Sequence, residues 1–219
     1  MQELQSLKSI FKDRLFKIPD YQRGYAWSIR HLKDFWEDTV NLPKDKFHYT
    51  GLLSLKKVND TVYKNWNDDL WLIEDQGYKP FHVVDGQQRL TTINILYVAL
   101  YRFAKENNLN SEADRLYNMF LTNQYVEQES SKLKLKQTDQ NSLAFKAIMN
   151  ATENEFGGYS NVIENYNFFR SIITIDNFEI IKNGLKRLIF VEISLERDKD
   201  DPQRIFESLN STGLELSQS

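Results

Sequence analysis

The sequence contains no cysteine, and only 8 glycines and 4 prolines occur among its 219 residues. Without cysteine the protein has no disulfide framework, no thiolate zinc site and no cysteine nucleophile. Hydrophobic residues make up 41% and aromatic residues 13%, which excludes a disordered or low-complexity chain and supplies material for a core. This length is typical of one domain, or of one domain with a helical extension.

Long apolar runs are also missing. The first ten residues lack the hydrophobic segment of a signal peptide, and no stretch approaches the roughly 20 apolar residues of a membrane span. We therefore expect no membrane segment and a cytoplasmic location.

Motifs of several enzyme classes are absent as well. The chain has no Walker A, GxGxxG, HExxH or His-Asn-His arrangement, and His31, His48 and His82 lack the spacing of metal ligands. Any nucleotide site must therefore belong to a class other than Walker A or GxGxxG.

The charge is small overall but unevenly distributed. A net charge of −3 excludes a histone-like polycation. Residues 8–34 carry seven Lys and Arg against three Asp, a net +4 that leaves the remainder of the chain at −7. This pattern fits either a basic face that meets an anion or ordinary scatter of surface charge.

Hydrophobic periodicity predicts an α+β fold with a mixed sheet and a helical subdomain. We expect strands at residues 50–56, 61–66, 70–74, 81–84, 132–136 and 188–193. We expect helices behind N-caps at Ser28 and Ser111, a strongly amphipathic helix after Gly86, and helices at residues 140–149, 161–173, 178–187 and 202–209. This order divides the chain into a core of residues 1–109, a helical insertion of residues 110–187, and residues 188–219, which return a strand and a helix to the core.

The junction between the strand at 81–84 and the long helix is the most informative local feature. Its sequence, VDGQQRLTT, has Asp85 at the strand's end and Gly86, which permits a sharp turn. The helix start offers unpaired N–H groups, the positive end of the dipole, and the side chains of Gln87, Gln88, Arg89, Thr91 and Thr92. These donors predict an anion site in which Arg89 binds phosphate through two parallel hydrogen bonds. Asp85 suits a divalent metal or an attacking water. Helix capping is the simpler alternative.

A second segment, IPDYQRGYAW at residues 18–27, combines an irregular loop with stackable rings. Tyr21, Tyr25 and Trp27 supply the rings, Gln22 an amide and Arg23 a guanidinium. This mixture suits a nucleobase and its phosphate. The alternative is a loop packed by its own aromatic residues, with Arg23 paired to Asp20.

Two weaker candidates lie elsewhere. Asn210, with Ser211 and Thr212, suits polar contacts to the anion site after Gly86. The alternative is that these residues form an ordinary helix C-terminus. Lys132, Lys134 and Lys136 alternate with leucines, which places the lysines on one strand face. That face suits a DNA backbone, or it is a solvated edge strand protected by lysines.

Three segments together resemble a known family. Residues 18–27, VDGQQRLTT at 84–92 and IFESLNSTGLEL at 205–216 are similar, in order and spacing, to the N-terminal domain of GmrSD-type modification-dependent restriction endonucleases. KLKLKQTD at 132–139 resembles a further family strand and turn. The likeness implies a ParB/sulfiredoxin-like fold with a strand–turn–helix phosphate site.

The resemblance also implies a function. It implies binding and hydrolysis of a nucleoside triphosphate (NTP) with Mg²⁺, in a system that restricts modified foreign DNA. Asp85 and Gln88 are the expected catalytic residues, with Asp85 also on the metal. Nucleotide contacts are expected from Gly86, Gln87, Arg89, Thr91, Thr92, Tyr21, Gln22, Arg23, Tyr25 and Asn210.

The resemblance further implies a partner for DNA cleavage. The family pattern continues beyond Ser219 into a helix and an HNH-type nuclease domain or partner subunit, so we expect no nuclease activity from these residues. The alternatives are a non-catalytic module that reads modified DNA and, less favoured, a protein-interaction domain with a vestigial pocket.

Overall fold

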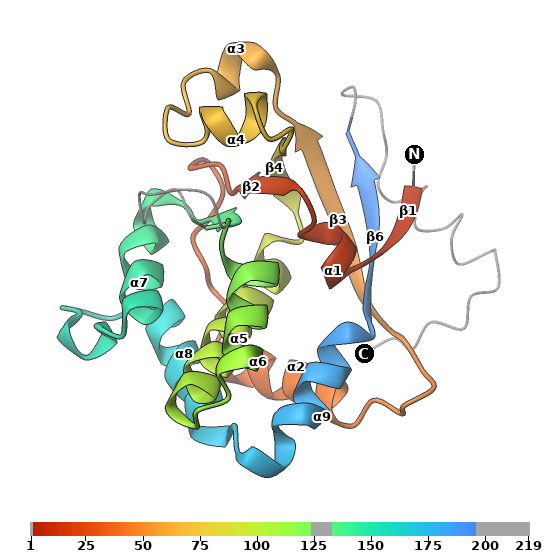
Figure 1. Ribbon diagram of the computed structural model, residues 1–219, viewed down its shortest axis with the longest axis vertical. Helices are drawn as coiled ribbons and strands as arrows, with labels where there is room; N and C mark the ends of the chain where they lie inside the picture. Colours follow the sequence, from red (N-terminus) through yellow and green to blue (C-terminus); the bar gives the residue numbers. More distant parts are fainter. Residues whose placement is uncertain (1, 124–132, 196–219) are drawn as a thin grey trace.

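A computed structural model describes residues 2–123 and 133–195, and its sheet and helices form separate layers (Figure 1). The strands are β1 (Gln2–Ser6), β2 (Arg14–Lys17), β3 (His48–Lys57), β4 (Lys79–Asp85), β5 (Leu135–Lys136) and β6 (Leu188–Ser194). They form one sheet in the order β1-β6-β3-β4-β2-β5. The β1–β6 and β3–β4 pairs are antiparallel, whereas β6–β3, β4–β2 and β2–β5 are parallel. The sheet is therefore mixed, as predicted.

The larger helices gather on one side of the sheet (Figure 1). The α-helices are α1 (Leu7–Ile10), α2 (Ile29–Val40), α3 (Asp60–Tyr63), α4 (Leu70–Glu74), α5 (Gln87–Glu106), α6 (Asn110–Leu116), α7 (Asp139–Asn150), α8 (Asn161–Ile172) and α9 (Ile175–Lys186). A π-helical turn, η1 (Tyr117–Leu121), and a 3₁₀ turn, η3 (Glu153–Glu155), complete the description. One large hydrophobic cluster joins residues of the sheet to residues of α5, α6, α7, α8 and α9.

Helix α5 occupies the centre of this core. It follows Gly86 as predicted, but it is buried on nearly every side between Leu90 and Leu100 rather than amphipathic. Its polar residues Thr91, Thr92 and Asn94 are buried as well. Because protein surrounds this helix of 20 residues, bulk water screens its macrodipole only weakly.

Several predicted elements are confirmed. Strands cover residues 50–56, 81–84 and 188–193, and helices cover 140–149, 161–172 and 178–186, each with bounds that differ by a few residues. Ser28 is the N-cap of α2, whose Leu32 and Phe35 are buried. The helix predicted at 202–209 lies outside the described residues. Strands β1 and β2 were not predicted, because each is too short to show a clear alternation.

Residues 61–66 and 70–74 are not a pair of strands. Asn59 caps α3 by accepting a hydrogen bond from the N–H of Val62 at 3.2 Å. Leu72 and Ile73 of α4 pack on Leu15 of β2. The strand prediction was wrong because a segment of five or six residues with some apolar or β-branched side chains fits one helical turn as well as a strand.

Helix α6 begins one residue before its predicted cap. Its N-cap is Leu109, and Ser111 lies within the helix.

The strand predicted at residues 132–136 differs more from its prediction. Lys134 is buried, and its Nζ donates to the backbone oxygen of Phe11 at 3.1 Å, while Lys136 forms an ion pair with the buried Asp69. The expected solvated face of lysines is therefore wrong for these two residues, because the protein interior supplies their partners. Lys132 lies outside the described residues.

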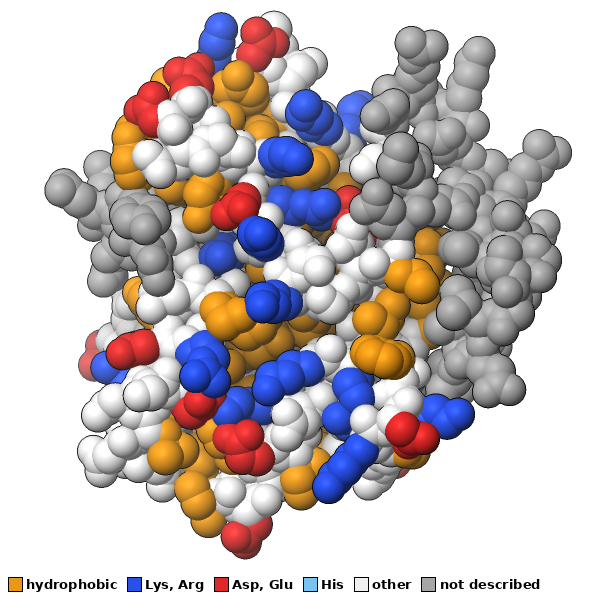
Figure 2. Space-filling model, turned by 45° about the vertical axis from the view of Figure 1, so that its right-hand side comes forward, with side chains coloured by type: hydrophobic (Ala, Val, Ile, Leu, Met, Phe, Trp, Pro, Cys, Tyr) orange, Lys and Arg blue, Asp and Glu red, His pale blue; other side chains and the backbone are white. Residues whose placement is uncertain are grey.

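Basic side chains are prominent on one face of the molecule. In Figure 2 Lys and Arg extend from the upper to the lower part of this face, around a patch of hydrophobic side chains. Lys8 and Lys12, from the basic N-terminal segment, are exposed. Within residues 2–123 and 133–195, no helix combines the length and apolar character needed to cross a membrane. The predicted division at residues 109 and 187 and the closer ParB/sulfiredoxin likeness stay predictions.

Candidate functional site

The site is built around the turn that joins β4 to α5. Gly86 is the N-cap of α5 and has a φ of +87°, in the region that favours glycine. A Cβ at this position would lie 2.7 Å from the backbone oxygen of Leu52 on β3. No side chain in the described ranges caps the helix, so the N–H groups of its first turn are left for another acceptor.

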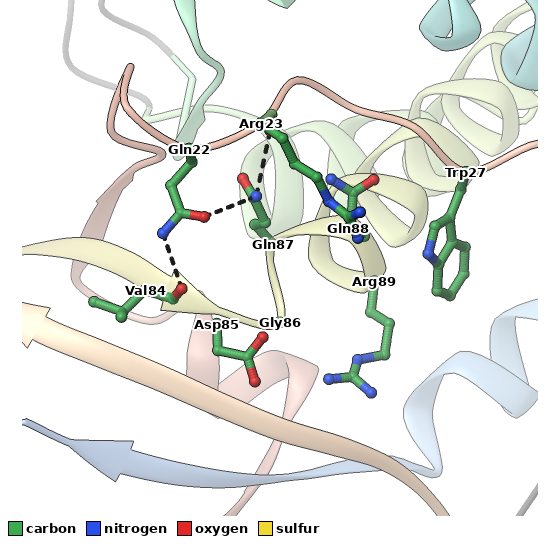
Figure 3. Close-up of a pocket in the computed structure, with 9 residues that line it drawn as sticks. All are labelled: Gln22, Arg23, Trp27, Val84, Asp85, Gly86, Gln87, Gln88 and Arg89. Atoms are coloured by element: carbon green, nitrogen blue, oxygen red, sulfur yellow. Dashed lines mark hydrogen bonds between the residues drawn. The ribbon is translucent and has the colours of Figure 1, made fainter. Parts of the chain in front are cut away.

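A loop of residues 19–27 lies over this turn. Gln22 donates from Nε2 to the backbone oxygen of Val84 at 3.0 Å. Gln87 in turn donates from Nε2 to Gln22 Oε1 at 3.0 Å and to the backbone oxygen of Arg23 at 3.3 Å. Figure 3 shows these bonds beside the end of β4. The two glutamines therefore join the loop to both sides of the strand–helix turn.

Gln88 holds the next part of the loop. Its Nε2 donates to the backbone oxygen of Gly24 at 3.1 Å, and its Oε1 accepts from the N–H of Ala26 at 2.8 Å. The side chain is buried. Both ends of this amide are thus engaged with the backbone, and contact with a ligand would require one of these bonds to open.

Tyr25 anchors the loop in the core. Its hydroxyl lies 2.6 Å from Thr92 Oγ1 and accepts from Asn165 Nδ2 at 2.9 Å. Burial raises the pKa of Tyr25 to about 12, although both hydrogen bonds oppose that shift. Asn165 also donates to the backbone oxygen of Trp27 at 2.8 Å. Thr91 is buried too and donates to Gln137 Oε1 at 3.3 Å.

A cavity of about 340 Å³ lies where the loop, β4 and α5 meet. We call it the first cavity; its lining is Gln22, Arg23, Trp27, Val84, Asp85, Gly86, Gln87, Gln88 and Arg89. In Figure 3 Arg23 extends from the loop toward the start of α5, and Arg89 extends from α5 toward β3. Two guanidinium groups and an uncapped helix N-terminus therefore share one cavity, which favours an anion.

Arg89 is held in place by β3. Its Nη2 donates to the backbone oxygen of Leu52 at 3.3 Å. The guanidinium lies so close to Gly51 that a Cβ there would be 2.3 Å from Arg89 Nη1. Burial raises the pKa of the nearby Tyr49, and the positive charge of Arg89 opposes this shift. Arg23, by contrast, is exposed and free to adjust to a ligand.

Comparison with known families places the chain in one of them. The chain matches the family described as "GmrSD restriction endonuclease, N-terminal domain" over residues 7–219. The chain belongs to this family. It is therefore the N-terminal domain of a restriction-system component. No curated protein matches the chain.

The GmrSD N-terminal domain has one carboxylate in the first cavity. Asp85 is exposed at the end of β4, and no described side chain forms an ion pair with it. No group of three or more His, Cys, Asp and Glu residues within residues 2–123 and 133–195 is arranged to bind a metal. Mg²⁺ is commonly held by one or two carboxylates together with substrate phosphates, so the single Asp85 would hold it only together with the phosphates of a ligand.

The remaining predicted site residues are more scattered. Tyr21 is 78% exposed and does not line the first cavity. Tyr25, Thr91 and Thr92 lie beneath the loop rather than on the cavity wall. Asn210 lies outside the described residues.

Sequence reasoning missed three residues that support the site. Gly51 makes room for Arg89, while Asn165 and Gln137 bind Tyr25 and Thr91 from the region predicted as a helical insertion. No local pattern marks any of them, because each acts through a contact distant in sequence.

Proposed function

We propose that this domain binds and hydrolyses an NTP within a system that restricts modified foreign DNA. The observation that carries the proposal is the uncapped N-terminus of the 20-residue α5, which opens into a cavity flanked by Arg23 and Arg89. Backbone N–H groups at a helix start, with a glycine that lets the chain turn, are a recurring way to bind phosphate. The match to the GmrSD family over most of the chain supports the same reading.

The phosphates lie against the first turn of α5 in this proposal. Arg89 is already oriented by Leu52 and meets them from the β3 side, and Arg23 meets them from the loop. Each charge-assisted hydrogen bond contributes about 1.5–3 kcal/mol to binding. Asp85 orients the attacking water or holds Mg²⁺, which when bound neutralises charge on the phosphates.

For Gln88 we propose a positioning role instead of the predicted catalytic one. Its amide is already bonded at both ends to Gly24 and Ala26, on the stretch of loop that follows Arg23. We propose a positioning role for Gln87 as well, because its Nε2 bonds the Gln22 side chain and the backbone of Arg23. The adjacent glutamines thus hold the backbone from which the exposed Arg23 side chain extends toward the phosphates.

Calorimetry with each NTP and Mg²⁺ tests the proposal. Arg23→Gln removes a charge without breaking any hydrogen bond of the Arg23 side chain within the described ranges, and Arg30→Gln on the exposed side of α2 is the matched control. We expect Arg23→Gln to weaken NTP binding about tenfold or more and Arg30→Gln to change it less than twofold. Failure of the folded wild-type protein to bind any NTP would refute the proposal.

Phosphate release tests the role of Asp85. We expect Asp85→Asn to lower turnover far more than NTP affinity, because the carboxylate acts on the water or metal. Equal losses of affinity and turnover would contradict this role.

A second candidate function is a non-catalytic module that reads modified DNA. The basic face in Figure 2 favours it, since Lys and Arg side chains suit a phosphate backbone. Binding of modified duplex that weakens steeply with salt and does not respond to NTP would support this candidate over the first.

A further inference from the structure

A second cavity adjoins the first. It has a volume of about 450 Å³ and lies between α2 and the start of β3. Its lining is Trp27, His31, Asp34, Phe35, Glu37, Asp38, His48, Thr50 and Arg89. Trp27 and Arg89 line both cavities, so a ligand that contacts Arg89 has access to the two together.

The walls of the two cavities differ in charge. Arg23 and Arg89 flank the first cavity. The second has three carboxylates from one side of α2, at Asp34, Glu37 and Asp38. A DNA strand laid through both would bring its phosphates against these carboxylates, which is unfavourable. A ligand with one anionic end and one uncharged, hydrogen-bonding end matches the change in charge.

One wall of the second cavity is formed by His48. The His48 side chain is 8% exposed, and neither ring nitrogen makes a hydrogen bond to any described residue. The nearest acid, Asp38, is 3.9 Å from His48 Nε2, beyond hydrogen-bonding range. Neither ring nitrogen of His48 is among the fully enclosed polar atoms that lack a partner in the described residues, so the ring is open to the cavity. A hydroxyl or amine of a ligand in this cavity would be able to bond it.

A pair of aromatic rings lines the second cavity. The rings of Trp27 and His31 are stacked with centroids 5.6 Å apart and planes at 17°. His31 is fixed through Nδ1, which accepts from the N–H of Ser28 at 3.3 Å, and the backbone of Trp27 is held by Asn165. A pre-formed flat ring beside polar acceptors is typical of sites that bind a nucleobase.

We propose that the second cavity receives the nucleoside part of the NTP, with Trp27 beside the base and His48 and Asp34 bonding its hydroxyl or amino groups. This inference rests on the proposed function, which supplies the phosphates in the first cavity. It assigns recognition of the uncharged part of the ligand to α2 and β3, whereas VDGQQR binds only the charged part. The ligand is accordingly a mononucleotide, and inorganic triphosphate binds less tightly.

The test compares two probes on the same protein. The affinity of each NTP and of inorganic tripolyphosphate, all with Mg²⁺, is measured by calorimetry at pH 8 for wild type, His48→Leu, Asp34→Asn and the control Asp45→Asn. Asp45 is exposed and lines neither cavity. The preferred NTP should bind wild type at least about tenfold more tightly than tripolyphosphate, since several hydrogen bonds are added.

The variants should separate the two ends of the ligand. His48→Leu should weaken NTP binding about fivefold and alter tripolyphosphate binding less than twofold. Asp34→Asn should weaken NTP binding, yet leave tripolyphosphate unchanged or bound more tightly, because a negative charge is removed. Asp45→Asn should affect neither ligand. If His48→Leu does not fold, Asp34→Asn still tests the inference, because it should weaken binding of NTP and not of tripolyphosphate.

Each contrary result has a distinct meaning. Equal wild-type affinity for NTP and tripolyphosphate, or equal losses of both in the variants, overturns the inference while leaving the phosphate site intact. Absence of binding by both ligands refutes the proposed function, and the inference fails with it.

Discussion

Replacing Gln88 with methionine distinguishes a positioning residue from a catalytic one. The substitution keeps the length of the side chain but removes both amide contacts, at 3.1 Å to the oxygen of Gly24 and 2.8 Å from the N–H of Ala26. Each such bond contributes about 0.5–1.5 kcal/mol net, so the free energy of unfolding should fall by roughly 1–3 kcal/mol. Thr92 donates to the backbone oxygen of Gln88, and that bond is unaffected by the change.

Urea denaturation followed by circular dichroism measures this loss. Gln76→Met is a matched control, because Gln76 is exposed after α4; it should change the free energy by less than about 0.5 kcal/mol. Affinity for the NTP should fall as well, because the loop that carries Arg23 is held less firmly.

A purely catalytic Gln88 would give a different result. Turnover would then fall while stability and NTP affinity remained at wild-type values. That outcome would refute the reasoning from the two hydrogen bonds.

Three further predictions follow from other parts of the structure. Gly86→Ala should destabilise the protein by about 1–2 kcal/mol through its positive φ alone, and by more because its Cβ would meet the oxygen of Leu52; thermal denaturation measures this, and an unchanged melting temperature would contradict it. Tyr25→Phe should lower the free energy of unfolding by about 1 kcal/mol at pH 7, because the hydroxyl hydrogen bonds are lost. The raised pKa of Tyr25, from 10.0 to about 12, makes the wild type lose stability between those values because the unfolded chain deprotonates first, and urea titrations of the Phe variant should lack this contribution. Burial lowers the pKa of Lys134. Its buried positive charge therefore destabilises the folded protein below this lowered pKa, and the free energy of unfolding rises as the pH increases from there toward the ordinary value of 10.5. Lys134→Met should flatten that alkaline rise in stability, and an identical pH profile for variant and wild type would argue against a desolvated ammonium.

Long periodic segments and the strand–turn–helix motif could be predicted from the sequence. The helix after Gly86 and the strand at 188–193 have enough apolar residues in a regular pattern to specify their type. Residues 61–66 and 70–74 lack such a pattern, and they form helical turns that pack on β2. Short segments take the conformation that tertiary contacts impose.

The chemistry of the site was harder to infer than its position. The sequence brings Gln87 and Gln88 to the helix start, but it does not show that their amides are bonded to the loop of residues 19–27. The sequence likewise predicts that Lys134 lies on the surface, whereas in the structure it is buried and donates to the backbone oxygen of Phe11. Hydrogen bonds between distant segments decide which polar groups remain free for a ligand.

The place of β6 in the sheet has a consequence for synthesis of the protein. Strand β6 lies between β1 and β3, and β1 has no other partner strand among the described residues. On a ribosome, β1 and β3 emerge more than a hundred residues before the strand that joins them. Until then two sheet edges are open, and such edges pair readily with other chains. A nascent or truncated chain that stops before residue 188 therefore lacks the strand that joins β1 to β3 and is exposed to aggregation, however well the turn at Gly86 is formed.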